Sequence, residues 1–282
     1  MKKLAGLCAC LSVVLGGGAM VAQDMAPPKV LVIDREFTKP GKDGSPHQKS
    51  ESAFVSALTA AKWPSNYFAM TSMSGRPRAL FLFAYDSFAA WEKDNQAMDK
   101  NAVLSATLDR LNVADGALLD EVTVSVFVYQ PELSVHVEGG IVHSRYFEIS
   151  QYHVKPGHRA EFLELVNLYK SGYEKIPTAN WATYASYYGE DNGGLFLAIT
   201  KLTSLAENDA NMGDDDKFAA LMGKEKMQKV RELTASSVES VQTNLFRFDP
   251  KMSYPPAEWI KEDSFWKPKP MAASKPAAPA NP

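Results

Sequence analysis

The amino-acid sequence predicts an α+β protein in which one β-α-β-β-α-β unit occurs twice. The main observation is self-similarity, because an alternating apolar segment followed by Lys-Pro-Gly occurs at 39–41 and again at 155–157. The next tryptophan, Trp63 or Trp181, follows each lysine by 24 and 26 positions. Further matches follow in the same order with nearly equal gaps, which favours a repeat over chance.

The later matches mark the middle and the end of each unit. Leu-Phe-Leu occurs at 80–82 and at 195–197, and a methionine follows an Asn/Asp-rich run at Met98 and Met212. Each unit then closes with an aromatic residue, one spacer and Pro-x-x-Ser, namely Tyr129, Pro131 and Ser134 in the first and Phe248, Pro250 and Ser253 in the second.

Each unit begins with a strand and a helix. Alternating apolar residues predict strands at about 29–37 and 144–153, and Pro-Gly ends each strand. In the first unit Ser45 before Pro46 predicts a helix with serine as N-cap and proline at N1. In the second unit helical spacing indicates the next helix, through Phe162, Leu165, Val166, Tyr169 and Tyr173.

Two more strands, a short helix, a longer helix and a last strand complete each unit. The paired strands are expected at 65–72 with 79–85 and at 180–188 with 194–201, joined by turn residues. The longer helices are expected near 101–114 and 214–235, and the last strands at 121–129 and 238–248. Asp214, Asp215 and Asp216 are interpreted as a helix start, because the pattern of a calcium loop is missing.

Both ends of the chain have the composition of segments outside the fold. Residues 1–22 combine two lysines, a short apolar run and small residues, which is typical of a secretory signal peptide. From Lys267 to Pro282 the chain is rich in Pro and Ala without apolar periodicity, which predicts a disordered tail. We therefore expect an exported protein, periplasmic or secreted, with no membrane span in its mature form.

Removal of the predicted signal peptide changes the net charge of the protein and leaves it without cysteine. The composition of 30 basic and 33 acidic residues becomes 28 and 33, a net charge of −5, which makes nucleic acid a poor partner. Cys8 and Cys10 are both lost, so a disulfide, a thiolate nucleophile and a cysteine-held metal are excluded. No histidine pair has the His-x-x-x-His spacing, and phosphate-loop and nucleophile-elbow motifs are missing. The sequence thus predicts no metal and no cofactor.

With its Lys-Pro-Gly motif, amphipathic helix and two close strands, the chain resembles the dimeric α+β barrel (ferredoxin-like) superfamily. Its relatives include antibiotic-biosynthesis monooxygenase-like and NIPSNAP-like domains. The resemblance covers 29–134 and 144–253, with a linker at 135–143 and a C-terminal extension at 254–282. It implies two tandem ferredoxin-like units whose sheets pair within one chain, as each sheet needs a cover for its second face.

Polar residues at one end of the first strands are the first candidate site. On one alternating face Leu31, Ile33, Arg35 and Phe37 correspond to Phe147, Ile149, Gln151 and His153. His153 is the candidate proton acceptor, because a neutral imidazole takes a proton near neutral pH; the alternative is a scaffold or solvated histidine. Arg35 is a candidate ligand-binding residue for a carboxylate, the alternative being an ion pair with a neighbouring strand.

The other candidate ligand-binding residues are Gln151, Tyr152, Tyr184, Tyr187 and Trp91. His47, His136, His143 and His158 rank below His153. The superfamily includes cofactor-free oxygenases, haem-degrading enzymes, haem chlorite dismutases and isomerase-like enzymes. The histidine that the haem-degrading members have on the helix carrying Trp91 is missing, which weakens a haem role.

Three functions remain open from the sequence. In the first, the protein binds a small apolar or aromatic molecule between sheet and helices. In the second, it is a cofactor-independent monooxygenase or isomerase-type enzyme that uses His153. In the third, it is a structural envelope protein whose core is packed shut by aromatic side chains. An oligomer is compatible with all three.

Overall fold

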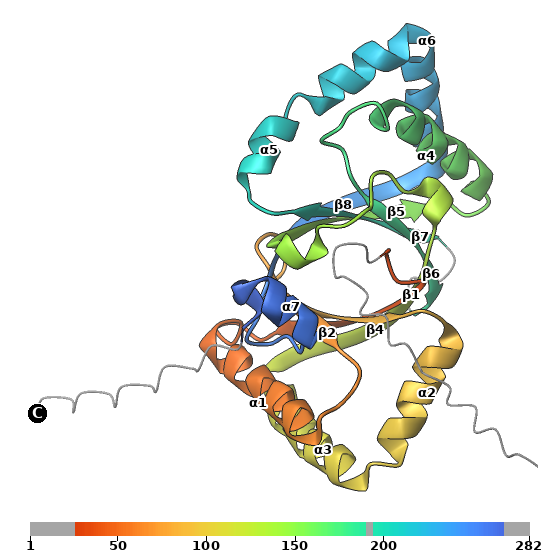
Figure 1. Cartoon of the computed structure of the whole chain (residues 1–282). Coiled ribbons are helices and arrows are strands. Elements are labelled where there is room, and N and C mark those ends of the chain that lie inside the picture. The colour runs from red at the N-terminus through yellow and green to blue at the C-terminus, as the bar shows by residue number, and fades with distance from the viewer. Residues whose placement is uncertain (1–25, 190–193, 268–282) are drawn as a thin grey trace, which may run out of the picture.

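The chain folds into a closed eight-stranded antiparallel barrel with helices on its outside (Figure 1). The computed structural model describes residues 26–189 and 194–267. The predicted signal peptide, residues 190–193 and the predicted tail beyond Lys267 lie outside the described residues. Within the described ranges, no helix is both long and apolar enough to cross a membrane.

The first half of the chain supplies four strands and three helices. In chain order these are β1 (Val30–Thr38), α1 (Ser45–Ala61), β2 (Tyr67–Ser72), β3 (Arg78–Tyr85), α2 (Phe88–Asp99), α3 (Ala102–Gly116) and β4 (Leu119–Tyr129). The short 3-10 turns η2 (Pro131–Leu133) and η3 (Ile141–His143) lead into the second half.

The second half repeats this order of elements. It contains β5 (Tyr146–Val154), α4 (Arg159–Tyr173), β6 (Ala182–Tyr188), β7 (Leu195–Leu202), α5 (Ala206–Asn211), α6 (Asp214–Ser237) and β8 (Val238–Phe248). Two short helical elements then follow, α7 (Ala257–Glu262) and η4 (Ser264–Trp266). The strands and helices expected from the sequence are confirmed to within two or three residues at their ends, including the start of α6 at Asp214.

One expected helix cap is wrong. Gly44 is the N-cap of α1, so the helix begins one residue earlier than the serine-cap pattern indicated, and Ser45 makes no side-chain capping bond. Pro46 still lies in the first turn, where its missing N–H leaves no helical hydrogen bond unmade.

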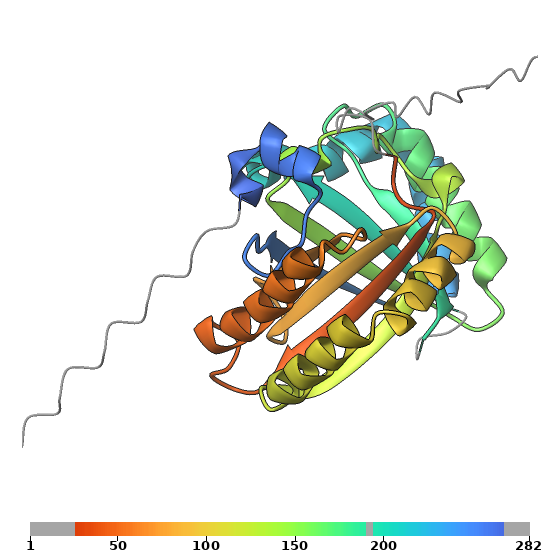
Figure 2. The ribbon, with the colours of Figure 1, turned by 60° about the horizontal axis from the view of Figure 1, so that its bottom comes forward.

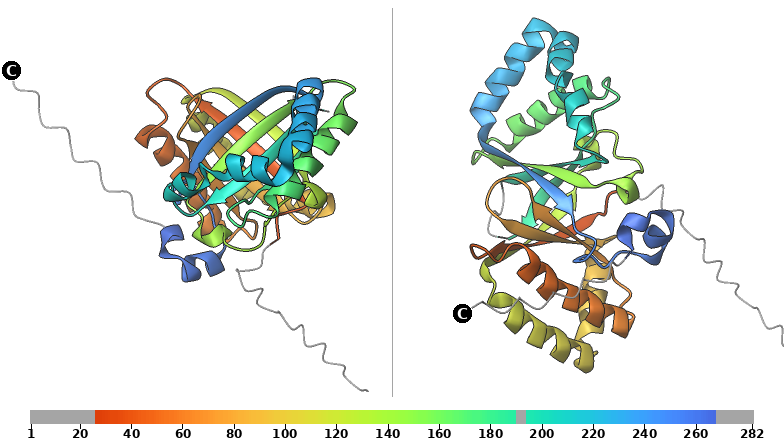
Figure 3. Two further views of the ribbon diagram at one scale, coloured as in Figure 1. Left: turned by 90° about the horizontal axis from the view of Figure 1, so that it is seen from above. Right: turned by 90° about the vertical axis from the view of Figure 1, so that its left-hand side faces the viewer.

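The strands run around the barrel in the order β1-β3-β2-β8-β5-β7-β6-β4. Each half therefore contributes four neighbouring strands, and the halves meet at two seams, β2 with β8 and β4 with β6. Helices α1 to α3 cover the outer face of the first sheet (Figure 2). Helices α4 to α6 cover the other side of the barrel, so the barrel lies between two helical layers (Figure 3).

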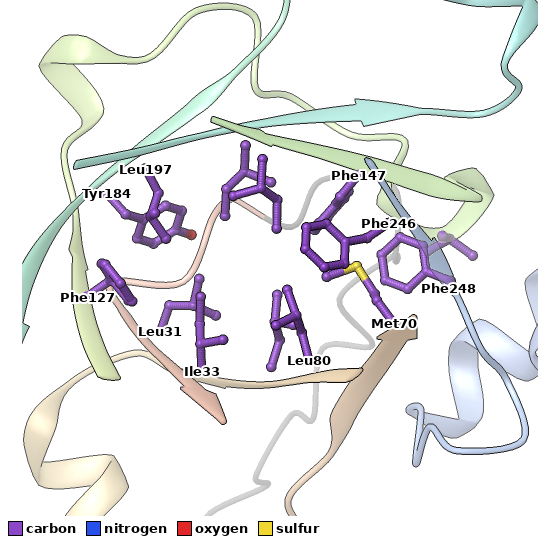
Figure 4. Packing of buried hydrophobic residues seen from close by; sticks show 14 of the residues in the cluster. Leu31, Ile33, Met70, Leu80, Phe127, Phe147, Tyr184, Leu197, Phe246 and Phe248 are labelled. Atoms are coloured by element: carbon purple, nitrogen blue, oxygen red, sulfur yellow. The ribbon is translucent and has the colours of Figure 1, made fainter. Parts of the chain in front are cut away.

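Alternate residues of the strands fill the inside of the barrel. Leu31, Leu80, Phe127, Leu197 and Phe246 are each at most 4% exposed and belong to one apolar cluster (Figure 4). Because side chains alternate along a strand, the neighbours of these residues point outwards to the helices. This assignment of inner and outer faces decides which residues a ligand between sheet and helices would meet.

The C-terminal extension closes one end of the barrel. Trp259 of α7 and Trp266 of η4 are 1% and 0% exposed and belong to the inner cluster. The Asp263 side chain accepts a hydrogen bond from the Phe265 N–H and forms an ion pair with Arg145 at the start of β5. Part of the segment expected to be an extension is thus core.

The Pro-x-x-Ser motifs join the two halves. Ser134 Oγ accepts a hydrogen bond from the Thr183 N–H of β6 at 2.9 Å and donates to a carbonyl of its own turn. Ser253 Oγ likewise accepts from the Ala69 N–H of β2 at 2.9 Å. In each case the serine follows the last strand of one half and binds an edge strand of the other. Each Pro-x-x-Ser motif therefore stabilises the pairing of the two halves at one of the two seams.

We expect Ser134→Ala and Ser253→Ala each to lower the free energy of unfolding by about 1 to 3 kcal/mol, because each leaves a buried N–H without its acceptor. The two losses should add, since the seams lie on separate strand pairs. Chemical denaturation measures both. Ser56→Ala on the exposed face of α1 is the matched control and should change stability little. A loss no larger than that of the control would contradict the role of the motif.

Acid should weaken the packing of the C-terminal cap, formed by α7 and η4 (residues 257–266), on the barrel. Burial raises the pKa of Asp263, but hydrogen bonds from Phe265, Arg145 and His143 outweigh it and hold that pKa below its usual value. The stabilisation is therefore complete above the usual value near 3.9 and is lost as pH falls through the lower folded-state pKa. Asp263→Asn should cost about 1 kcal/mol at pH 7.

Thermal melting of both proteins between pH 7 and pH 2 checks this expectation. The difference in midpoint should persist down to about pH 4 and close below it. If the difference in melting midpoint were unchanged at pH 2, the negative charge of Asp263 would contribute nothing to the stability of the protein.

Candidate functional site

A cavity of about 350 Å³ lies between the first sheet and its helices. Strands β1 to β4 provide its floor, and α1, α2 and α3 provide its walls. Most of the lining is apolar or aromatic, with polar groups gathered at two places. The main lining residues are Val32, Asp34, Glu36, Glu51, Phe54, Trp63, Tyr67, Phe81, Phe83, Tyr85, Trp91, Asp94, Asn112 and Val124.

One end of the floor is acidic because of the alternation along β1. Leu31, Ile33 and Arg35 point into the barrel, so Asp34 and Glu36 point outwards to the helices. Both carboxyl groups therefore lie between sheet and helices, at positions that correspond to Ser150 and Tyr152 in the second half.

Helices α1 and α3 add three more ionisable groups beside Glu36. His47 Nε2 lies 2.8 Å from Glu36 Oε2, 3.9 Å from Glu51 Oε1 and 3.8 Å from Asp115 Oδ1. His47 and Glu51 are one helical turn apart on α1 and so share a face. Three of these residues are almost fully buried, since His47, Glu51 and Asp115 are 2%, 5% and 2% exposed.

The carboxyl groups of this cluster repel one another in a region of low polarity. Burial raises the pKa of Asp34 to about 7, with a further contribution from Glu36. Burial also raises the pKa of Glu51 to about 10, aided by the charges of Glu36 and Asp115. The pKa of Glu36 is raised by burial too, although the hydrogen bond with His47 opposes this.

The opposite end of the cavity is aromatic. Trp91 of α2 packs against Tyr85 of β3 with ring centroids 6.3 Å apart. Asp94 of α2 accepts hydrogen bonds from Ser65 and from the Tyr85 hydroxyl, the latter at 2.9 Å. Helix α2 is therefore anchored to the sheet by a polar contact, with an indole exposed to the cavity beside it.

The equivalent space in the second half is filled. Phe218 of α6 stacks on Tyr173 of α4 with ring centroids 4.5 Å apart, and Phe162 lies 4.8 Å from Phe196 of β7. Gly172 permits this close packing, because a Cβ there would lie 2.5 Å from the Phe218 ring. The cluster also includes Leu165, Met222, Val230 and Leu233.

The barrel itself contains a smaller cavity of about 110 Å³ next to the C-terminal cap. Its walls are almost wholly apolar and include Leu31, Phe68, Phe147, Tyr184, Trp181 and Trp259. Lys201 lines the same cavity, and its ammonium donates hydrogen bonds to the carbonyls of Val137 and Glu138. The space is small for an aromatic ligand of drug size.

The structure places the polar strand residues inside the barrel and at its rim. Arg35 donates a hydrogen bond to Ser125 at 2.9 Å and lies over the Phe127 ring, so it faces the barrel interior and not the helices. Gln151 is opposite Leu197 and Gln242 in the sheet. His153 lies opposite Leu195 and Ser240 near the end of β5, and it lines neither of the two cavities described above.

The aromatic candidates are dispersed. Tyr152 packs against Phe162 in the filled second half, and burial raises its pKa to about 12. Tyr184 lines the small barrel cavity, whereas Tyr187 is 49% exposed and contacts Phe88 of α2. Trp91 alone among the predicted residues lines the larger cavity. The predicted residues are therefore not brought together as one site.

Sequence reasoning missed the acidic cluster. Asp34 and Glu36 were available as the other alternating face of the first strand, and His47 and Glu51 as a His-x-x-x-Glu pair at helical spacing. Asp115 carries no local signal, because only the packing of α3 beside α1 brings it to His47.

No protein-family model matches the chain, and no curated protein matches it by sequence. Solved structures do match its fold. A candidate monooxygenase from Fusobacterium nucleatum is 10% identical, with a TM-score of 0.50 over 79% of this chain and 94% of that one. An anthrone oxidase-like protein is 10% identical, with a TM-score of 0.50 over 78% and 91% of the two chains.

A mutant chlorite dismutase from Candidatus Nitrospira defluvii is also similar, at 10% identity and a TM-score of 0.47 over 84% of this chain and 96% of that one. At such identities the likeness shows the fold alone. The chain thus has a closed α+β barrel whose fold is similar to that of the candidate monooxygenase and of the anthrone oxidase-like protein.

Because the second half is filled and the first half encloses a cavity, removal of a phenyl ring should lower the free energy of unfolding by different amounts in the two halves. Phe218→Ala should lower the free energy of unfolding by about 3 to 5 kcal/mol, because it empties a closed core. Phe54→Ala should cost roughly 1 kcal/mol, because Phe54 lines the open cavity and is only partly buried. Urea denaturation gives both values. Equal costs would mean that the first half is as tightly packed as the second.

Proposed function

We propose that this protein binds one small aromatic or apolar molecule in the cavity between the first sheet and helices α1 to α3. The observation that carries the proposal is the asymmetry of the halves. The same elements enclose about 350 Å³ in the first half and a packed apolar cluster in the second, where the hollow on α6 is lined by that helix alone. Ligand sites are typically cavities of this size, mostly apolar with a few convergent polar groups.

The polar groups of the cavity restrict the ligand. A carboxylate or phosphate beside Asp34, Glu36 and Glu51 would make the ionisation of these carboxyl groups still less favourable, which argues against an anionic ligand in this cavity. A neutral aromatic molecule with a hydroxyl or amine fits better, since its ring can pack on Trp91 and its N–H or O–H can donate to a carboxylate. Arg35 faces the barrel interior and is not available for this ligand.

The proposal includes the finer organisation of the chain. In it, the two halves are tandem ferredoxin-like units derived from one another and paired within the chain. The equal order of elements and the two equivalent Ser134 and Ser253 seams support this relationship. Export through residues 1–22 is part of the same proposal and rests on the sequence pattern.

An enzyme is the second candidate. The fold is similar to that of a candidate monooxygenase and an anthrone oxidase-like protein, which favours a cofactor-independent oxygenase or isomerase-type activity. In this alternative the position of His153 outside the larger cavity requires its substrate to lie elsewhere. The third candidate, a purely structural protein, suits the filled second half but leaves the open cavity of the first without a role.

Native mass spectrometry of the protein purified from cells that export it tests the proposal. We expect a small organic molecule to stay bound to the wild type. Asn112→Trp should abolish this retention, because Asn112 is exposed on α3 at the edge of the cavity and an indole there would block it. Val113→Trp is the matched control, since Val113 is the next residue on α3 and is 81% exposed.

Binding lost in Asn112→Trp and retained in Val113→Trp would support the first-half cavity. Retention of the molecule by both variants would place the ligand elsewhere. A wild type that carries no molecule and binds none from a library of phenols and aromatic amines would overturn the proposed function.

A further inference from the structure

Four ligating side chains converge beside the cavity. Glu36 of β1, His47 and Glu51 of α1 and Asp115 of α3 each direct one nitrogen or oxygen atom to a common point, and these atoms all lie within 4.8 Å of one another. Three separate elements contribute, so the convergence depends on the tertiary fold and not on one local motif.

Hydrogen bonding within the protein leaves this cluster incomplete. The His47 imidazole is hydrogen-bonded to Glu36 at 2.8 Å. The Asp115 side chain is 4% exposed, yet its Oδ1 has no hydrogen-bond partner and points towards His47 Nε2 from 3.8 Å. Buried carboxylate oxygens normally have a partner, so this oxygen calls for a donor, an ordered water or an ion.

Charge balance leads to the same conclusion. Among the described residues, His47 is the ion-pair partner of Glu36, Glu51 and Asp115, and no lysine or arginine is paired with them. One imidazole is thus the basic group beside three buried carboxyl groups, and buried acidic groups are ordinarily paired or coordinate a metal.

We propose that Glu36, His47, Glu51 and Asp115 bind one divalent first-row transition-metal cation, of the class of Zn²⁺ or Mn²⁺. One imidazole nitrogen with three carboxylate oxygens is a donor set that suits these ions, whereas Ca²⁺ and Mg²⁺ prefer oxygen ligands alone. Oxygen and nitrogen ligands about 2.0 to 2.2 Å from a metal lie at most about 4.4 Å apart. At tetrahedral angles such ligands lie about 3.3 to 3.6 Å apart, so a bound cation would draw together any pair of atoms near the 4.8 Å limit.

The cation site borders the cavity on one side. Glu36 and Glu51 line the cavity, while His47 and Asp115 lie behind them. A cation held by these four side chains would lie next to the cavity, and any further ligand, such as water or a hydroxyl group, would have to come from the cavity side. The site stands independently of the proposed small-molecule binding, because its ligands come from the protein alone.

Metal titration of the full, untagged chain after chelator treatment tests the inference. Calorimetry with Zn²⁺, Mn²⁺ and Mg²⁺ in separate runs gives the stoichiometry, and the absorption spectrum with Co²⁺ reports the ligand field. We expect one equivalent of the transition metal, little binding of Mg²⁺, and visible Co²⁺ bands. Asp115→Asn and His47→Gln should each weaken affinity at least about 100-fold, since even outer-shell changes cost 10- to 100-fold.

Two control variants separate this site from surface binding. Asp94→Asn removes a carboxylate from the far end of the cavity, and His158→Gln removes an exposed imidazole that pairs with Glu161. Both should bind the metal as the wild type does. Circular dichroism of the metal-free proteins checks folding, and Asp115→Asn carries the test if His47→Gln does not fold.

The inference would be overturned by a wild type that binds no equivalent of Zn²⁺, Mn²⁺ or Co²⁺. It would also be overturned if Asp115→Asn kept the wild-type affinity and Co²⁺ spectrum, or if His158→Gln abolished them. Loss of the metal in Asp115→Asn with an intact organic ligand would separate the cation site from the proposed function of the cavity.

Discussion

Both faces of each four-stranded sheet are apolar, and neither sheet is covered on both sides by its own helices. The inner residues, such as Leu31 and Phe246, reach at most 4% exposure only because the other sheet lies opposite. Barrel closure is the constraint on which the remaining structure depends. The seams β2–β8 and β4–β6 make it possible, and Ser134 and Ser253 fasten them in the same way.

Barrel closure also allows the packing between sheet and helices to differ between the two halves. The inside of the barrel is shared, so a change there affects both halves, whereas the space under each helical layer belongs to one half. In the second half Gly172 and Phe218 allow α4 and α6 to pack tightly. In the first half an apolar cluster that includes Leu58, Phe81 and Leu104 fills part of this space, carboxyl groups on β1 and α1 lie beside it, and a cavity remains. The cost of burying those charges argues that they serve a ligand and not the fold.

Much of the fold could be predicted from the sequence because its signals are local. Alternation along 30–38 and helical spacing along 159–173 are visible without tertiary knowledge, and the repeated motifs fixed the order of elements. The acidic face of β1 was equally visible, but alternation cannot say which face lies inside a closed barrel. Arg35 and Glu36 are adjacent in sequence and yet belong to different environments. Asp115 joins His47 only through the packing of α3 on α1, for which the sequence carries no marker.

The central claim is that one half of the barrel holds a ligand site and the other does not. A crystal structure of the protein purified without chelator, with anomalous data at transition-metal edges, tests it most directly. We expect density for a bound molecule or ordered solvent between the first sheet and α1 to α3, and an anomalous peak between His47 and Asp115. Beneath α4 and α6 we expect density for side chains only. Side chains filling the first-half cavity, with no peak at the cluster, would contradict it.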